Sequence, residues 1–466
     1  MNNFNNMMEA RKIHFIGIGG SGMSGIASVL HDIGYEVSGS DISNSSNLES
    51  LITKGLKITI GHSEKNILGK EVVVISSAIS SDNIEVITAR NLGIPIIMRA
   101  QMLAELMRFS YGIAIAGTHG KTTATSILVH ILCAAGIDPT YVIGGKIIDS
   151  SNAGLGTSQY LVAEADESDA SFIHLQPIIS VVTNIDKDHL VNHSNNFNTL
   201  KENFIKFIHN LPFYGLCIIN INDIEILSIM DKISRPIKTF GIEKKCDYMA
   251  KKIDISDQSS VYRVVEDSEE YEIKFKMPGR HNIFNSLAAI SVARELGVKI
   301  KDIQKSLKNF HGIKRRFEIL GDFRCEDRTF KWIDDYGHHP SEIREILYSI
   351  KNIWPKRRII FVFQPHRYTR TKELYEQFKE VFINTEYLIL TDIYPAGEEK
   401  IENISGYSLF ESVKKYNKNI SYVENLGDLH NIVNSNICDN DILLTMGAGD
   451  ISKFVENYLR YLKNDK

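Results

Sequence analysis

Cysteine, long apolar runs and an excess of either charge are scarce in this sequence of 466 residues. The five cysteines form no C-x-x-C pair, and an odd number of scattered cysteines is typical of a reducing compartment. No apolar run reaches the roughly 18 residues that a membrane-spanning helix needs, and the polar N-terminus resembles no signal peptide. The net charge of −4 argues against binding nucleic acid through its phosphates. We expect a cytoplasmic protein with no nucleic-acid partner and no membrane insertion.

Short apolar runs alternate with helix-like segments along the whole chain, which predicts α/β architecture with parallel sheets. A chain of this length predicts two to four domains. Three successive strand–helix series place the boundaries near residues 106 and 313. We therefore predict three α/β domains, over residues 1–106, 107–313 and 314–466, of which the first is Rossmann-like.

A glycine-rich turn follows the first apolar strand and opens a helix. Gly17, Gly19 and Gly22 fit G-x-G-x-x-G, and Asp41 ends the next apolar stretch about 20 residues later. Such a turn binds a diphosphate at a helix N-terminus. Taken alone, the pattern favours NAD and an NAD-dependent oxidoreductase, but it indicates a bound anion rather than a particular nucleotide.

The segment "GTHGKTT" is the strongest single motif, because it also follows an apolar strand and opens a helix. Lys121 would bind the β- and γ-phosphates of a nucleotide, and the Thr122 hydroxyl would bind Mg²⁺. The loop is a variant of the usual phosphate-binding pattern, since Ile115 stands where that pattern has its first glycine. The predicted loop comprises Gly117, Thr118, His119, Gly120, Lys121, Thr122 and Thr123.

Acidic residues follow the next two predicted strands, where Mg²⁺ would find oxygen ligands. Glu164 is the first choice for such a ligand, with Asp166 and Glu167 as substitutes. His189 lies in a turn with two acids after the following strand, which suggests a metal or substrate role. Exposed acidic turns and structural histidines are the simpler alternatives.

Polar clusters also mark the start of a later helix and two turns near the C-terminus. "GRHNIFNSLAA" opens a helix, where its polar residues either cap the helix or face a ligand. "DDYGHHPSE" packs acids and histidines before a proline. "FQPHRYTRT" follows an apolar strand, and its two arginines, three apart, could face the same way and clamp a carboxylate or phosphate. A solvated basic turn is the alternative.

The order of these motifs, together with "RRFE", resembles the Mur ligase family over essentially the whole chain. The resemblance implies an N-terminal Rossmann-like domain for a UDP-sugar, a central ATPase domain, and a C-terminal Rossmann-like domain for the incoming amino acid. It also implies dependence on ATP and on two Mg²⁺ ions.

The resemblance further implies roles for individual residues. Gly19, Gly20, Ser21, Gly22, Met23 and Ser24 would hold the UDP-sugar diphosphate, and Asp41 its ribose or a neighbouring polar group. Residues 117–123 with His281, Asn282 and Asn285 would face ATP. Thr122 and Glu164 would hold one Mg²⁺ and His189 the other. Asp335, Tyr336, His338, Arg367 and Arg370 would surround the amino acid and the transition state, with His189 and His338 as candidate general bases.

Within the family, the motifs are most similar to those of members that join L-alanine to UDP-N-acetylmuramate through an acyl phosphate. Three alternatives stay open at this stage: a recycling ligase that adds a tripeptide to the same UDP-sugar, a nucleotide-binding scaffold without activity, and the oxidoreductase. We expect a monomer or a homodimer.

Overall fold

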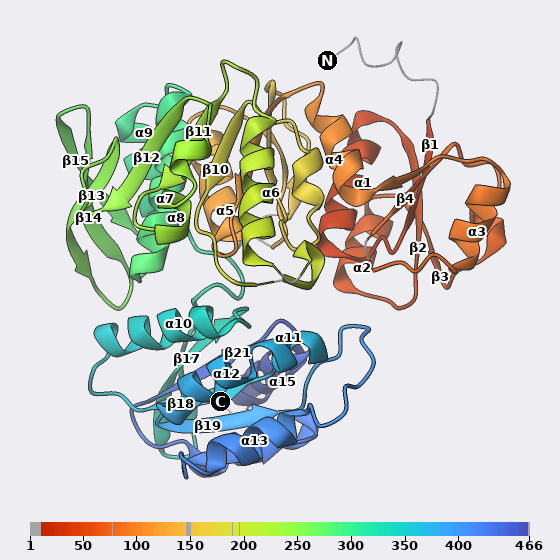
Figure 1. The fold of residues 1–466 in the computed structure, drawn as a ribbon. Coiled ribbons are helices and arrows are strands. Elements are labelled where there is room, and N and C mark those ends of the chain that lie inside the picture. The colour runs from red at the N-terminus through yellow and green to blue at the C-terminus, as the bar shows by residue number, and fades with distance from the viewer. Residues whose placement is uncertain (1–10, 77, 146–150, 189, 195, 465–466) are drawn as a thin grey trace. The chain divides into compact units, whose positions relative to one another are not determined.

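The computed structural model describes residues 11–76, 78–145, 151–188, 190–194 and 196–464. Over these residues the chain builds sheets of five, ten and six strands, in chain order (Figure 1). The chain forms two compact units. The first, which ends at Phe310 with two short interruptions, holds the first two sheets, and the second holds the third sheet. No helix among the described residues is long and apolar enough to cross a membrane.

The first sheet is parallel, with strand order β3-β2-β1-β4-β5. Its strands are β1 (Lys12–Ile16), β2 (Glu36–Asp41), β3 (Lys57–Ile60), β4 (Val72–Ile75) and β5 (Ile96–Met98). Its helices are α1 (Ser21–Ile33), α2 (Ser46–Thr53), α3 (Ile84–Asn91) and α4 (Arg99–Met107). The strand order reverses at β1, so the glycine turn between β1 and α1 lies where parallel sheets bind their ligands.

The second sheet has the order β15-β14-β13-β12-β11-β10-β6-β9-β7-β8, and its strands from β13 to β7 are parallel. Its strands are β6 (Tyr111–Ala116), β7 (Thr140–Val142), β8 (Ala153–Gly154), β9 (Tyr160–Glu164), β10 (Ile179–Val182), β11 (Leu216–Asn220), β12 (Ile237–Ile242), β13 (Tyr248–Ile255), β14 (Ser260–Glu266) and β15 (Glu269–Phe275). Its helices are α5 (Lys121–Ala134), α6 (Phe197–His209), α7 (Ile224–Leu227), α8 (Arg280–Glu295) and α9 (Ile300–Lys308). Helices cover both faces, with α6 in front of the sheet and α5 behind it in Figure 1.

The third sheet has the order β16-β17-β21-β18-β19-β20, and only its β16–β17 pairing is antiparallel. Its strands are β16 (Glu318–Cys325), β17 (Arg328–Asp335), β18 (Ile359–Phe363), β19 (Tyr387–Thr391), β20 (Ile420–Val423) and β21 (Asp441–Met446). Its helices are α10 (Pro340–Ile353), α11 (Tyr368–Glu373), α12 (Tyr375–Ile383), α13 (Gly406–Lys414), α14 (Leu429–Asn436) and α15 (Ile451–Asn464). Short 3₁₀ turns are η2 (Glu64–Asn66), η3 (Ser171–His174), η4 (Leu190–His193), η5 (Met230–Lys232) and η6 (Leu426–Asp428).

Strand β18 illustrates why the parallel strands appear in the sequence as continuous apolar runs. Alternate side chains of a strand point to opposite faces, and here both faces are covered. Phe361 and Phe363 pack with residues of α10, α12 and α13, whereas Ile360 and Val362 pack with residues of α14 and α15. The core therefore lies in two layers, one on each face of the third sheet.

The predicted α/β class, with three sheets made mainly of parallel strands, is confirmed. Both glycine-rich motifs follow strands that are buried apart from their first residue and precede helices, as the sequence indicated. The domain boundaries near residues 106 and 313 stay a prediction.

We expect Phe361→Ala to lower the unfolding free energy of the second unit by about 3–5 kcal/mol, since the side chain is fully buried and its removal leaves a cavity. Both tryptophans, Trp332 and Trp354, lie in this unit, so their fluorescence in urea reports its unfolding. Tyr348→Ala, at an aromatic that is 59% exposed on α10, is the control and should shift the midpoint little. Equal shifts in the two variants would contradict this packing.

Candidate functional site

The "GTHGKTT" loop connects the end of β6 to the start of α5. Gly117 and Gly120 adopt positive φ angles of 136° and 81°, which other residues rarely tolerate. The first N–H groups of a helix have no partner inside it and carry partial positive charge. The loop therefore presents donors where a phosphate group would bind.

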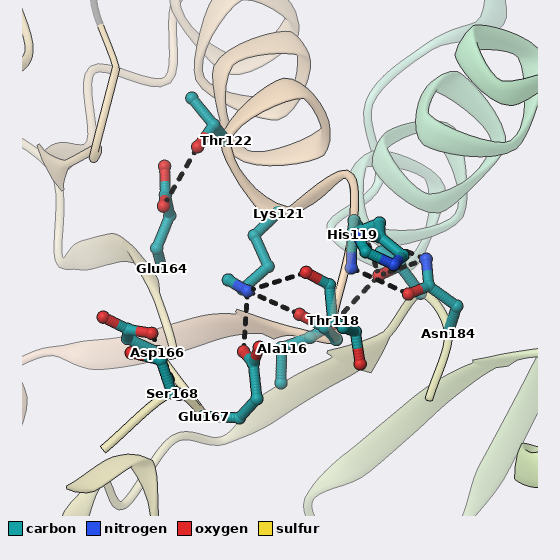
Figure 2. Close-up of polar contacts among 12 residues, drawn as sticks. Ala116, Thr118, His119, Lys121, Thr122, Glu164, Asp166, Glu167, Ser168 and Asn184 are labelled. Carbon is teal, nitrogen blue, oxygen red and sulfur yellow. Dashed lines mark hydrogen bonds and ion pairs between the residues drawn. The ribbon is translucent and has the colours of Figure 1, made fainter. Parts of the chain in front are cut away.

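Neighbouring side chains hold this loop in shape from the end of β10 (Figure 2). The Asn184 amide accepts the His119 N–H at 2.8 Å and donates to the His119 carbonyl at 2.9 Å. The Thr183 hydroxyl donates to the same carbonyl at 2.7 Å, and the Thr118 hydroxyl accepts the Asp186 N–H at 2.9 Å. The segment "TNID", in which the sequence suggested ligands, thus braces the phosphate loop.

Close packing also requires glycine at positions 117 and 120. A Cβ atom on Gly117 would lie 2.1 Å from Thr183 Oγ1, and one on Gly120 would lie 2.3 Å from Asn285 Oδ1. Asn285, on α8, therefore lies against the loop, and its predicted contact with the nucleotide stays a prediction. Asn282, one helical turn earlier, is buried.

His281 belongs to the second compact unit, unlike its two asparagine neighbours. Its ring Nδ1 lies 3.4 Å from Ser349 Oγ, and its centroid lies 5.9 Å from that of Phe317. Burial lowers the pKa of His281 to about 4, so the ring is neutral at physiological pH. These contacts give it a packing role, and its predicted contact with a nucleotide stays a prediction.

Lys121 directs its ammonium group into the loop (Figure 2). The group donates to the carbonyls of Gly117 at 2.7 Å and Thr118 at 3.2 Å, and to Glu167 Oε2 at 2.6 Å. Burial opposes the charged ammonium, but the carboxylates of Glu167, Asp166 and Glu164 raise the pKa of Lys121. Burial also raises the pKa of Glu167, which is only 2% exposed. Lys121 is therefore a fixed positive charge at neutral pH.

Glu164, Asp166 and Glu167, the three acids proposed as metal ligands, have different partners. These partners distinguish Glu164 from the other two. The Thr122 hydroxyl donates to Glu164 Oε2 at 3.2 Å, and Glu164 Oε1 accepts the Gly144 N–H at 2.8 Å. Asp166 instead pairs with Arg99 at 3.1 Å, and Glu167 pairs with Lys121. Thr122 and Glu164 thus supply two neighbouring hard oxygens, which fits the ligand preference of Mg²⁺.

His189, the predicted second metal ligand, lies outside the described residues. Its neighbour Asp186 is described: Asp186 Oδ2 accepts from His119 Nε2 at 3.1 Å.

The first glycine turn is organised by Asp41. Asp41 Oδ2 accepts the Gly19 N–H at 2.8 Å, and its Oδ1 accepts the Ile42 N–H at 2.8 Å. The carboxylate thus holds the backbone of the turn, and its predicted contact with the UDP-sugar stays a prediction. Ser24 and Met23 have buried side chains, and the Ser24 N–H and hydroxyl donate to the carbonyls of Gly20 at 2.8 Å and Ser21 at 3.0 Å. The other predicted residues of this turn are Gly20, Ser21 and Gly22, at the N-terminus of α1.

In the second unit, "DDYGHHPSE" starts at the end of β17. Asp335 is 5% exposed and accepts the Phe317 and Gly337 N–H groups, each at 2.6 Å. Burial raises its pKa to about 6. Asp335 therefore holds the backbone of the turn, while Tyr336 and His338 lie together with ring centroids 5.7 Å apart.

The "FQPHRYTRT" segment joins the same cluster through His366, whose ring centroid lies 5.6 Å from that of His338. Arg370 is buried and places Nη1 3.3 Å from His366 Nδ1. Arg367 has a positive φ of 71°, and its side chain is 45% exposed beside Glu398. Arg367 directly precedes the helix that carries Arg370, and the prediction that the two arginines face the same way stays a prediction.

The sequence motifs did not indicate a role for several residues that lie at the site. Arg315 and Arg316 of "RRFE" place their guanidinium groups 5.5 and 4.9 Å from the Tyr336 ring, and Tyr394 stacks on His366 at 5.6 Å. Asn184 and Arg99 also had none. A position just after a strand was the available signal for both residues, Asn184 after β10 and Arg99 after β5.

The comparisons with known proteins cover nearly the whole chain. Residues 12–111 match the Mur ligase family catalytic domain, residues 115–293 the Mur ligase middle domain, and residues 315–449 the Mur ligase, glutamate ligase domain. The chain is 48% identical over 449 residues to a UDP-N-acetylmuramate–L-alanine ligase of Vesicomyosocius okutanii subsp. Calyptogena okutanii (strain HA), covering 95% of this chain and 96% of that one.

Two solved structures are similar along the chain. UDP-N-acetylmuramate–alanine ligase MurC from Thermotoga maritima has a TM-score of 0.83 and 29% identity, with 98% of this chain and 100% of that one covered. A murein peptide ligase from Psychrobacter arcticus 273-4 has a TM-score of 0.74 and 23% identity, with 97% and 98% covered, and at that identity it supports the fold alone.

We expect Gly120→Ala to weaken ATP binding about ten-fold or more, because its Cβ would displace Asn285 and distort the loop. Gly136→Ala is a matched control: its φ is 78°, but nothing lies within 4 Å of the added Cβ. Both changes carry a left-handed backbone cost of roughly 1–2 kcal/mol. Titration calorimetry with ATP distinguishes them, and equal losses of affinity would show that strain alone is responsible.

Proposed function

Since this chain belongs to the Mur ligase family, we propose that it joins L-alanine to the carboxylate of UDP-N-acetylmuramate, with ATP cleaved to ADP and phosphate. The observation that carries this proposal is the loop of residues 117–123, which pairs a buried lysine with a hydroxyl–carboxylate pair at the end of two parallel strands. The relative of 48% identity supports the choice of substrates.

A carboxylate is a poor acyl donor, so the reaction must first activate it. A carboxylate oxygen of the muramyl group attacks the γ-phosphorus, the bond to the β,γ-bridging oxygen breaks, and ADP leaves. The alanine amine then attacks the acyl carbon, the carbon–oxygen bond to phosphate breaks, and the nitrogen loses a proton. Lys121 and the N–H groups of the loop would stabilise the charge on the transferred phosphoryl group.

Thr122 and Glu164 are the residues proposed to hold one Mg²⁺. The ion would draw charge from the phosphate oxygens when bound. His189 stays a candidate ligand for a second ion on sequence grounds.

His338 is the candidate for removing the proton from the alanine amine. Its Nδ1 lies 3.2 Å from the Tyr336 carbonyl, and since a carbonyl only accepts, Nδ1 must be the nitrogen that carries hydrogen. In the neutral ring Nε2 is then the acceptor nitrogen. Arg370, Arg367 and Tyr336 complete the proposed amino-acid site, and Asp335 would support its backbone.

We also propose that the turn of residues 19–24 binds the diphosphate of the UDP-sugar, in a domain that ends near residue 106. The central domain would end near residue 313 and the amino-acid domain would follow. A cytoplasmic location and a monomeric or homodimeric state complete the proposal.

The alternatives have less support. The murein peptide ligase is similar in fold at 23% identity, against 48% for the alanine-adding relative. An NAD-dependent oxidoreductase would have no use for the loop around Lys121. A nucleotide-binding scaffold without activity would not need the Thr122–Glu164 pair.

We expect phosphate release from ATP only when UDP-N-acetylmuramate and L-alanine are both present. Omitting either substrate tests the reaction, and replacing alanine with the recycling tripeptide tests the sibling activity. Lys121→Ala should abolish release while the far-ultraviolet circular dichroism stays unchanged, because the loop loses its fixed cation. Release that required the tripeptide would overturn the choice of substrate.

We expect Glu164→Gln to raise the Mg²⁺ concentration for half-maximal activity about ten-fold or more, because an amide is a weaker ligand than a carboxylate. Glu49→Gln, the same change at an exposed residue of α2, is the control. An unchanged Mg²⁺ dependence in Glu164→Gln would exclude this residue as a ligand.

A further inference from the structure

Arg99, the first residue of α4, contacts the acidic turn that follows β9. Its Nη2 lies 3.1 Å from Asp166 Oδ2 and 3.6 Å from Asp169 Oδ2, and its side chain is 21% exposed. These two ion pairs orient the guanidinium group.

The same guanidinium group lies against the first turn of α1. A Cβ atom on Gly22 would lie 2.8 Å from Arg99 Nη1 and 3.3 Å from its Cδ. The absence of a side chain at Gly22 is thus what allows Arg99 to reach the helix backbone. Gly22 is the third glycine of the G-x-G-x-x-G pattern, which links this contact to the diphosphate turn.

Two positive elements meet at this point. The N–H groups of Ser21, Gly22 and Met23 open α1, and the first N–H groups of a helix have no acceptor inside it. A helix N-terminus carries partial positive charge, which repels a neighbouring guanidinium group. Asp166 and Asp169 contact Arg99 through Nη2, so an anion bound between Nη1 and the helix would satisfy both positive elements.

We propose that Arg99 binds the diphosphate of the UDP-sugar together with the first turn of α1, an inference that rests on the proposed function. The planar guanidinium group offers two edges. One holds the acidic turn, and the other faces the anion. Because Glu167 follows Asp166 directly and binds Lys121, Arg99 also ties the diphosphate turn to the ATP loop through one short acidic segment.

The test is titration calorimetry with UDP-N-acetylmuramate in the absence of ATP and Mg²⁺. Arg99→Met should raise the Kd about ten- to a hundred-fold, as for the loss of a charge-assisted hydrogen bond, and Arg99→Lys should lie between. Arg108→Met is the matched control, since Arg108 follows the same helix and is 57% exposed beside Glu105. Its Kd should equal that of the wild type.

A second variant separates binding from support of the acidic turn. Asp166→Asn removes a carboxylate partner of Arg99, so a binding role predicts a Kd for UDP-N-acetylmuramate that is unchanged or lower. A merely structural bridge predicts that Asp166→Asn and Arg99→Met weaken binding equally, which would overturn the proposal. Uridine, which has no phosphate, should bind Arg99→Met and the wild type alike, and this also shows that the variant is folded.

The outcomes separate this inference from the proposed function. If the wild type binds UDP-N-acetylmuramate and Arg99→Met binds it with the same Kd, the role of Arg99 is wrong and the proposed function stands. If the wild type does not bind it, both are wrong.

Discussion

The buried ammonium group of Lys121 is the interaction on which the proposed chemistry depends. It is held between two loop carbonyls and the carboxylate of Glu167, so its position is set before any phosphate approaches. The loop around it consists largely of glycine and small polar residues and has little shape of its own. Thr183 and Asn184 from the next strand, and Asn285 from α8, supply that shape.

The acids after β9 also hold cations of the first unit in place. The proposed phosphoryl transfer would bring several negative groups together, and carboxylates would repel them. Asp166 and Glu167 instead pair with the cations Arg99 and Lys121, while Glu164 lies beside the Thr122 hydroxyl, where the proposed metal ion would bind. Three acids close together in the sequence thus take different roles because each meets a different partner.

The sequence predicted the parts of the site that depend on strand ends. Parallel strands end at the same edge of a sheet, so a loop after β6 and acids after β9 had to meet, and Thr122 and Glu164 do. Roles set by tertiary contacts could not be predicted. Asp41 bonds to the glycine turn, and Arg99 reaches across to the turn after β9, because of how separate elements pack.

The second unit shows a further limit of sequence reasoning. Arg367 has a positive φ and directly precedes α11, whereas Arg370 lies within that helix. Spacing alone does not reveal such a backbone conformation. The same holds for Tyr394, which meets His366 from a separate loop with no motif of its own.

In the proposed reaction, ATP held by the loop of residues 117–123 transfers a phosphoryl group directly to the muramyl carboxylate. Labelling both oxygens of that carboxylate with oxygen-18, followed by mass spectrometry of the released phosphate, tests this transfer. We expect one labelled oxygen in each phosphate and one retained in the amide product. Unlabelled phosphate, with ATP consumed and amide formed, would rule out this route of activation.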